Sequence, residues 1–297
     1  MTRFLDVRLH AVGGELAVRV SVFQGTTISD YTGMLLGDFL AQIRGRHVFV
    51  VAHGFNVNRA DGIACLAHWE TLLQLQEPAV FVGLLWPGDS VWAHGLDYPS
   101  EPRVANNAGQ LIAQFLDANF GGAASISLAS HSLGARVVLE TAQQMKRGLR
   151  GVIMMAPAID DNCLTTEFST AAANAGTISV LASRKDSVLS GLFPLGNFFA
   201  GILTVGHPWW HAALGHTGPA SPAPANFVAP FEISDSWNFS HGDYLKIAYP
   251  SPPQLPLPTV VAPDGSYQYP QSFGPNGQLV DGWQAAFTAA FASTRLR

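Results

Sequence analysis

Charged side chains are scarce in this sequence. Lysine, arginine, aspartate and glutamate together make up 12% of its 297 residues, and the net charge at pH 7 is −5. No cluster of lysine or arginine stands out, so the chain lacks the basic patch by which proteins hold nucleic acids, and we expect no nucleic-acid partner. Hydrophobic residues, by contrast, make up 48% of the chain. Large buried strands account for such a composition, and so does an exposed apolar pocket or lid.

Cysteine is nearly absent as well. The two present, Cys65 and Cys163, are far apart and lack the spacing of metal ligands, which favours two buried free thiols in a reducing compartment. Residues 1–8 contain no continuous apolar run of the kind found in a secretory signal, and we expect a cytoplasmic protein. The stretch most like a membrane span, residues 188–205, is interrupted by a proline and an asparagine, which argues against a transmembrane helix.

Five short apolar runs follow one another through the chain, at residues 47–52, 80–86, 125–129, 151–156 and 177–182. Runs this uniformly apolar are typical of strands that are covered on both faces, as in a parallel sheet. Helical patterns alternate with them, at about 60–76, 103–119, 133–147 and 162–175. The alternation predicts a doubly wound α/β sheet, which a single domain of residues 1–297 is long enough to form.

Both ends of the chain depart from this alternation. Two runs with alternating apolar residues, 4–12 and 15–23, are joined by two glycines and predict a hairpin at the start. Between residues 187 and 229, glycine, proline and aromatic residues crowd together, and we expect this segment to be a cap or lid inserted into the domain. A last strand is expected at 231–234 and a terminal helix at 281–293.

Residues 130–134 read Ser-His-Ser-Leu-Gly and lie between an apolar run and a helical pattern. A serine in a tight turn from strand to helix is held in a strained backbone conformation with its hydroxyl exposed. The first amides of the helix then point at negative charge that develops beside it. This arrangement activates a serine as a nucleophile when a base and an acid follow later in the chain. Ser132 is therefore the best catalytic candidate.

A second segment completes the surroundings of this serine. Residues 53–56, His-Gly-Phe-Asn, directly follow the first core strand, and the glycine allows a sharp turn. The backbone amide of Phe55 can then face the site beside that of Leu133, and two such donors stabilise a tetrahedral oxyanion. An ordinary turn is the alternative for this segment. We expect the His53 side chain to pack or to form a hydrogen bond beneath the loop.

The acid is expected after a strand that follows the nucleophile. Asp186 lies just past the run 177–182, at the end of the strand where sites form in such sheets. It is the first candidate for orienting a histidine, and an exposed carboxylate paired with Lys185 is the alternative. Asp160 and Asp161 also follow a strand and are the second candidates for the acid.

The base is expected last in the chain. His241 lies in a polar loop after the predicted last strand and is followed by a glycine, so it completes the order Ser, Asp, His. Its rivals are His207, His211 and His216, whose spacing suggests a zinc site, but no carboxylate or cysteine is near them in sequence. We expect these three to line the lid or to bind nothing. His131, beside the candidate nucleophile, is expected to point away from the site.

Together these motifs resemble the α/β-hydrolase superfamily, and more narrowly a bacterial group once classified as a domain of unknown function with this fold. The resemblance covers about residues 45–245, and its matching segments are 50–57, 85–88, 128–136 and 155–160. It implies a mostly parallel, doubly wound sheet with helices on both faces and an inserted lid-like segment. One departure is Ser130, where the family has glycine; a small residue there still avoids a steric clash in the turn.

The resemblance implies acyl transfer to water, with Ser132 as the nucleophile, His241 as the base and Asp186 as the acid. Phe55 and Leu133 would supply the oxyanion amides, and no metal or organic cofactor is required. The expected function is a serine hydrolase of carboxylic esters, esterase-like or lipase-like. Amide and thioester hydrolysis use the same chemistry and stay open, as does a catalytically silent binding module.

The substrate is expected to be a small-molecule ester or a lipid-like molecule. Candidates for its pocket are aromatic residues of the insert and of the strand near residue 86: Trp86, Phe193, Phe198, Phe199, Trp209 and Trp210. A lid made of them would favour acyl chains or hydrophobic alcohols, and a lipase would need it to open in transient contact with a lipid interface. Plain packing or a dimer contact is the alternative for the insert, and packing for Trp86.

Overall fold

The structure is a computed structural model that describes residues 1–13, 15–73, 75, 78–89, 101–191, 211–228, 232, 233, 235 and 239–245. In this part of the chain nine strands form one sheet, in the order β3-β2-β1-β5-β4-β6-β7-β8-β9. The strands are β1 (Thr2–Arg8), β2 (Leu16–Gly25), β3 (Thr32–Gly33), β4 (His47–Ala52), β5 (Ala79–Leu85), β6 (Ser125–His131), β7 (Gly151–Met155), β8 (Ile178–Leu181) and β9 (Phe227–Val228). The expected terminal helix, 281–293, lies outside the described residues.

The sheet is antiparallel at one edge and parallel elsewhere. β1 pairs with β2 as the predicted hairpin, and β2 pairs with β3. All pairs from β1 to β9 across the centre are parallel, with Val50 of β4 opposite Val82 of β5 and Leu128 of β6. The predicted apolar runs are thus the central strands of a doubly wound sheet, buried on both faces.

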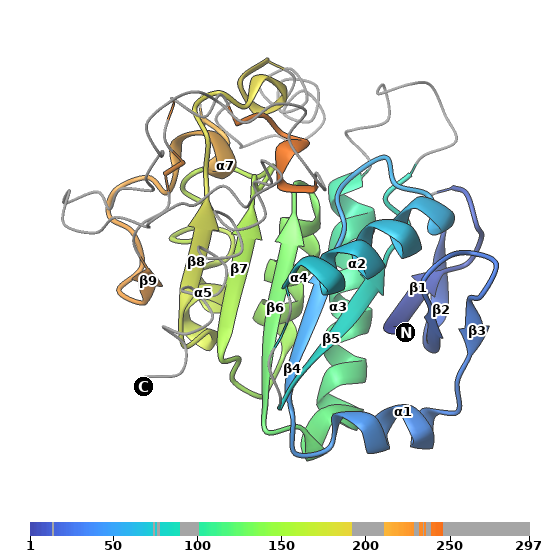
Figure 1. The fold of residues 1–297 in the computed structure, drawn as a ribbon. Helices are drawn as coiled ribbons and strands as arrows, with labels where there is room; N and C mark the ends of the chain where they lie inside the picture. The colour runs from blue at the N-terminus through green and yellow to red at the C-terminus, as the bar shows by residue number, and fades with distance from the viewer. Residues whose placement is uncertain are drawn as a thin grey trace.

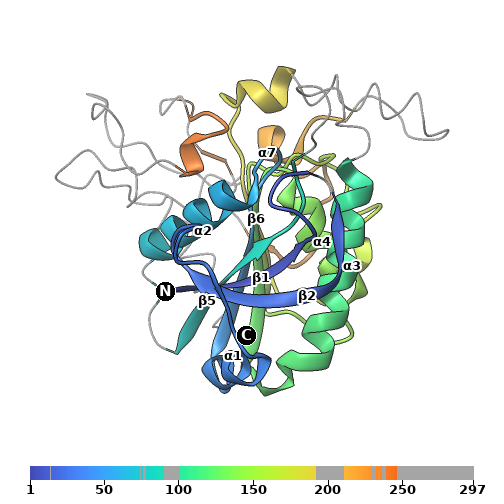
Figure 2. The same ribbon diagram turned by 90° about the vertical axis from the view of Figure 1, so that its right-hand side faces the viewer.

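Helices cover both faces of this sheet (Figures 1 and 2). α2 (Arg59–Leu73) lies on one face, and α3 (Glu101–Asn119), α4 (Gly134–Gln144) and α5 (Ser169–Asn174) lie on the other, with α1 (Leu36–Ile43) near the amino-terminal edge of the strands. One core packs between the sheet and α3, α4 and α5. The other packs under α2 and includes Leu189 from the helix at 187–191 and Phe239 and Tyr244 from the end of the described chain.

Two sequence predictions of secondary structure differ from the structure in place or length. In the stretch 231–234, where the last strand was expected, Glu232 makes an isolated parallel bridge to Ala182, and residues 231 and 234 lie outside the described residues; the strand β9 forms earlier, at 227–228. The reason is Asn226, whose side-chain amide donates to the carbonyls of Ala172 and Ala175 at 2.8 and 2.6 Å and so brings the next residues beside β8. The helix expected at 162–175 is shorter, since residues 161–168 form turns.

Both cysteines are free, as predicted, although Cys65 is partly exposed and only Cys163 is buried. Among the described residues, the structure contains no helix with the length and apolarity needed to cross a membrane. Most of the stretch 188–205 lies outside the described residues.

Candidate active site

Ser132 lies in a sharp turn at the carboxyl end of β6. Its φ of +53° is in the left-handed region, which is rare for a residue other than glycine. The turn is held by the Ser132 amide, which donates to the Met155 carbonyl at 3.0 Å. It passes so close to the β4 end that a Cβ on Gly134 would lie 2.4 Å from the His53 carbonyl oxygen. Ser132 is therefore a strained residue just before the start of α4, as predicted.

The structure brings Ser132, His241 and Asp186 into one hydrogen-bonded chain. His241 Nε2 lies 2.8 Å from Ser132 Oγ, and His241 Nδ1 lies 2.7 Å from Asp186 Oδ2. Because a carboxylate only accepts, the proton of neutral His241 lies on Nδ1, and Nε2 is left to accept the hydrogen of the Ser132 hydroxyl. Asp186 is fully buried and Ser132 is 6% exposed. A serine in such a chain can lose its proton to the imidazole as its oxygen attacks a carbonyl carbon.

Asp186 is fixed by the turn that follows β8. Its amide donates to the Ser183 carbonyl at 3.1 Å, and its Oδ1 accepts the amide hydrogen of Leu189 at 3.0 Å. One carboxylate oxygen therefore caps the short helix at 187–191, while the other contacts His241. The alternative, an exposed carboxylate paired with Lys185, is not what the structure shows: Asp186 is fully buried against His241, and Lys185 Nζ lies 3.9 Å from Asp235 Oδ2.

Asp161, a second candidate for the acid, contacts a different histidine. His211 Nδ1 lies 2.9 Å from Asp161 Oδ1, and His211 Nε2 accepts from the Asn162 amide at 2.9 Å. Asp161 lies 50 residues from His211 in sequence, and the contact forms because the loop after β7 folds back onto residue 211. Both ring nitrogens of His211 thus form hydrogen bonds with the loop after β7, and they hold residue 211 against that loop. His216 Nδ1 donates to the Ser183 carbonyl at 3.3 Å, and His207 lies outside the described residues.

His131 does not point away from the site, and this prediction was wrong. Its ring packs against that of His241 with centroids 4.8 Å apart, and its Nε2–H donates to the His241 carbonyl at 2.9 Å. Its ring also makes a T-shaped contact with Trp69 of α2, with centroids 6.3 Å apart. The loop that carries His241 crosses the same face of the sheet as α2, which sequence order alone does not reveal. Burial lowers the pKa of His131 to about 3, so its imidazole is neutral beside His241.

The loop after β4, residues 53–58 and below called the β4 loop, lies directly against Ser132. A Cβ on Gly54 would lie 3.0 Å from both Ser132 Cβ and His131 Nδ1, so only glycine fits here without displacing a neighbour. His53 packs beneath the loop as expected: its Nδ1–H donates to the Gly54 carbonyl at 2.9 Å, and burial lowers its pKa to about 4. The β4 loop thus brings Phe55 beside the serine, and the role of the Phe55 and Leu133 amides stays a prediction.

A cavity of about 110 Å³ opens beside Ser132. Its described lining is mostly apolar and comes from the β4 loop, from α2, from the serine turn and from the loop that carries His241: His53, Gly54, Phe55, Val57, Cys65, Trp69, His131, Ser132 and His241. Trp86, an expected pocket residue, is not among them. It is fully buried, and its Nε1–H donates to the His53 carbonyl at 2.8 Å, so it packs behind the β4 loop. The other five aromatic candidates, Phe193, Phe198, Phe199, Trp209 and Trp210, lie outside the described residues.

The low pKa values of His53 and His131 predict a fold that loses stability in acid. In the unfolded chain both histidines titrate near pH 6.5, whereas in the folded protein the pKa is about 4 for His53 and about 3 for His131. Between these values the unfolded chain binds more protons, so the free energy of unfolding falls as the pH drops below 6.5. Each histidine contributes about 1.4 kcal/mol per pH unit. Urea unfolding at pH 7, 6 and 5 is expected to show a shallower decline in His131→Gln, and an unchanged decline would contradict the assignment.

The parallel sheet, the serine turn after its central strand and the helices on both faces define an α/β-hydrolase fold. Residues 30–192, more than half of the chain, match the family described as "Alpha/beta hydrolase of unknown function (DUF900)", and the protein belongs to this family. A comparison with curated proteins found no match.

The chain is similar to several solved structures over part of its length. Esterase PE8 is 16% identical, with 54% of this chain and 78% of that one covered and a TM-score of 0.36. EstE1, a thermophilic carboxylesterase cloned from a metagenomic library, is 11% identical, with 65% and 74% covered and a TM-score of 0.33. A type II thioesterase from the yersiniabactin biosynthetic pathway is 20% identical, with 39% and 45% covered and a TM-score of 0.28.

Proposed function

We propose that the protein is a serine hydrolase that cleaves a carboxylic ester through an acyl-enzyme. The observation that carries this proposal is the hydrogen-bonded chain from Ser132 Oγ through His241 to the buried Asp186 carboxylate. A binding module that does no chemistry has no need of a serine held at a positive φ with its hydroxyl on an imidazole nitrogen. The membership in an α/β-hydrolase family is consistent with it.

The reaction follows from the order of these groups. Ser132 Oγ attacks the ester carbonyl and gives its proton to His241 Nε2, while Asp186 holds the imidazole in the required tautomer and stabilises the imidazolium. The imidazolium then protonates the leaving alcohol as the C–O bond breaks. Water attacks the acyl-enzyme with His241 again taking the proton, and the acid is released as Ser132 is restored.

The tetrahedral oxyanion formed in both steps needs hydrogen-bond donors. We assign this role to the backbone amides of Phe55 and Leu133. The close approach of Gly54 to Ser132 supports the first, and the position of Leu133 at the start of α4 supports the second. In measured cases the loss of one such donor costs about 3–4 kcal/mol of transition-state stabilisation.

Reaction with a fluorophosphonate probe tests the function. We expect covalent labelling of the wild-type protein, mapped by peptide mass spectrometry to Ser132. Esters and p-nitroanilides of one acyl group then compare the bond cleaved, and the ester should be turned over faster because an alkoxide or phenoxide leaves more readily than an amide anion. Absence of labelling at Ser132 in a folded protein would overturn the proposal.

The cavity beside Ser132 predicts a short acyl group. We place the acyl group there because it stays bound to the serine while the alcohol must depart. An apolar cavity of about 150 Å³ holds benzene, so about 110 Å³ accommodates a chain of about four carbons. In a p-nitrophenyl ester series, kcat/KM is expected to be highest near butyrate and to fall at octanoate.

A variant that narrows the cavity provides the control. Cys65 lines it from α2 and is partly exposed, so Cys65→Leu fills space without disturbing the core. We expect this variant to favour acetate over butyrate. A wild-type optimum at octanoate or longer would contradict the placement of the acyl group.

A further inference from the structure

We propose that Arg8, in the hairpin that precedes the family-matched segment, is a positioning residue: its buried guanidinium holds the β4 loop in the shape that turns the Phe55 amide toward Ser132. The proposal rests on the function proposed above, because it assigns the Phe55 amide to the oxyanion. Arg8 lies at the end of β1 and touches none of the reacting groups. It acts only through the backbone that it binds.

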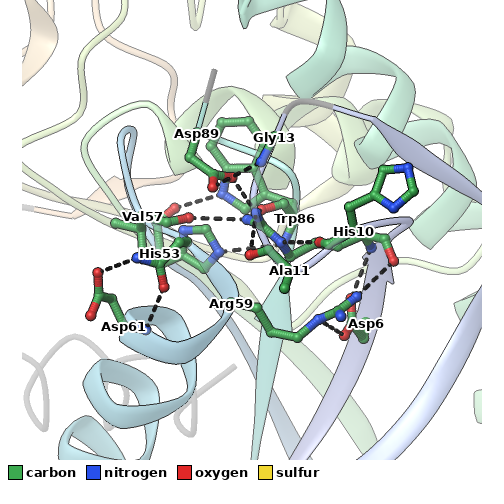
Figure 3. A network of polar contacts seen from close by, with 12 residues as sticks. Asp6, His10, Ala11, Gly13, His53, Val57, Arg59, Asp61, Trp86 and Asp89 are labelled. Atoms are coloured by element: carbon green, nitrogen blue, oxygen red, sulfur yellow. Dashed lines mark hydrogen bonds and ion pairs between the residues drawn. The ribbon is translucent and has the colours of Figure 1, made fainter. Parts of the chain in front are cut away.

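The guanidinium of Arg8 is fully buried, and most of its hydrogen bonds go to backbone carbonyls. Its Nη1 donates to the carbonyls of Val57 at 3.0 Å and Trp86 at 2.9 Å. Nε and Nη2 donate to the carbonyls of His10 and Ala11, each at 3.3 Å. Figure 3 shows these carbonyl-bearing residues converging on one point between the hairpin and the loops after β4 and β5. Three separate segments therefore meet on one side chain.

Asp89 balances the charge of this guanidinium. It is buried and forms an ion pair with Arg8 Nη2, while its other oxygen accepts the amide hydrogen of Gly13 at 3.1 Å. A buried ion pair of this kind contributes little more stability than apolar side chains of the same volume, because both charges lose their hydration. The guanidinium instead fixes the positions of its partners, since its planar N–H groups donate hydrogen bonds only in fixed directions.

Several hydrogen bonds join the β4 loop to the loop of residues 86–89, and Arg8 adds a further bridge between them. Trp86 Nε1 donates to the His53 carbonyl at 2.8 Å, and the Asn56 amide donates to the Gly88 carbonyl at 2.7 Å. Asn56 itself has a φ of +56°, a conformation that the surroundings must impose. Arg8 Nη1 links the carbonyls of Val57 and Trp86. This link follows Asn56 in the chain, whereas the contact at His53 precedes it.

The consequence for Phe55 follows from its place in the loop. It lies between the two contacts at Gly54 and Asn56, and Val57 is the next carbonyl fixed along the chain. Without Arg8, the carbonyls of Val57 and Trp86 are left without this donor inside the protein, and the segment must shift to reach water. A shift of about 1 Å in an oxyanion donor is enough to cost about 100-fold in rate. The hairpin thus takes part in the site although none of its described residues lines the cavity.

Two variants test this role, with a matched control. Arg8→Lys keeps the positive charge but lacks the planar guanidinium that donates to several carbonyls at once. Arg8→Met with Asp89→Leu removes the whole buried pair and avoids an orphaned charge, so it is expected to fold. Arg147→Lys is the control: Arg147 also donates to backbone carbonyls, those of Phe120 at 2.8 Å and Ala123 at 2.7 Å, just before the amino-terminal end of β6 and so at the other end of the strands from Ser132.

We expect both Arg8 variants to lose about 10-fold to 100-fold in kcat with little change in KM, since an oxyanion donor acts in the transition state. Amide hydrogen exchange in residues 54–57 is expected to be faster than in the wild type. Arg147→Lys is expected to change neither, even where its urea midpoint falls as much. Unchanged exchange and unchanged kcat in a folded Arg8 variant would overturn the proposal. The exchange measurement needs no activity, so a failure to label Ser132 would refute the proposed function separately.

Discussion

Replacement of Ser132 by alanine is expected to lower the turnover of a good ester substrate by about 10⁶-fold and to abolish fluorophosphonate labelling. Losses of this size are found when the nucleophile of a comparable triad is removed. The physical reason is that His241 and Asp186 act only through the Ser132 oxygen: without it, no acyl-enzyme forms and only the binding of substrate beside the amides remains. Steady-state kinetics and the labelling assay together measure the effect.

Ser130 supplies the matched control for this variant. It lies two residues earlier on β6, is fully buried, and its hydroxyl has no hydrogen-bond partner in the described part of the chain. Removal of such an orphaned hydroxyl is neutral or stabilising, so Ser130→Ala should keep both labelling and turnover near the wild-type level. Labelling that persists in Ser132→Ala, or that is lost in Ser130→Ala alone, would mean that the nucleophile has been misassigned.

The sheet was predictable because its central strands are buried on both faces. Such strands must be apolar at every position, so runs such as 47–52 and 125–129 stand out from a sequence of mixed composition. The shorter elements carry no comparable signal. α1 begins after Leu35, which forms no side-chain cap, and β9 has two residues, held in place by the distant contacts of Asn226. Tertiary contacts, more than local pattern, determine these elements.

The same division holds for the candidate site. The proximity of Ser132 and Asp186 could be predicted because each follows a parallel strand, β6 or β8, whose carboxyl ends lie at one edge of the sheet. His241 could be added because the resemblance places the base last in the chain. His131 and Arg8 were beyond such reasoning. The first is placed by a loop 110 residues away, and the second by carbonyls and a carboxylate between 2 and 81 residues away. Nothing in the neighbouring sequence marks either residue.

Asp186→Asn is expected to reduce kcat by about 10⁴-fold while leaving the fold intact. The contact of Oδ1 with the Leu189 amide decides the orientation of the new side chain, because only the amide oxygen can accept that hydrogen. The NH₂ group must then face His241 Nδ1 and donate to it. The imidazole proton moves to Nε2, which can no longer accept the Ser132 hydrogen, and a wrong tautomer has a cost of this order.

Asp161→Asn is the matched control, because its carboxylate also contacts a histidine Nδ1 at 2.9 Å but in a pair separate from Ser132. We expect it to retain the activity of the wild type. Fluorophosphonate labelling should be slowed in Asp186→Asn and not abolished, since the nucleophile is still present, whereas Ser132→Ala should show none. A full loss of activity in Asp161→Asn with little change in Asp186→Asn would transfer the role of the acid to the loop after β7. Equal turnover in both variants would mean that the buried carboxylate at 186 serves only to start the helix at 187–191.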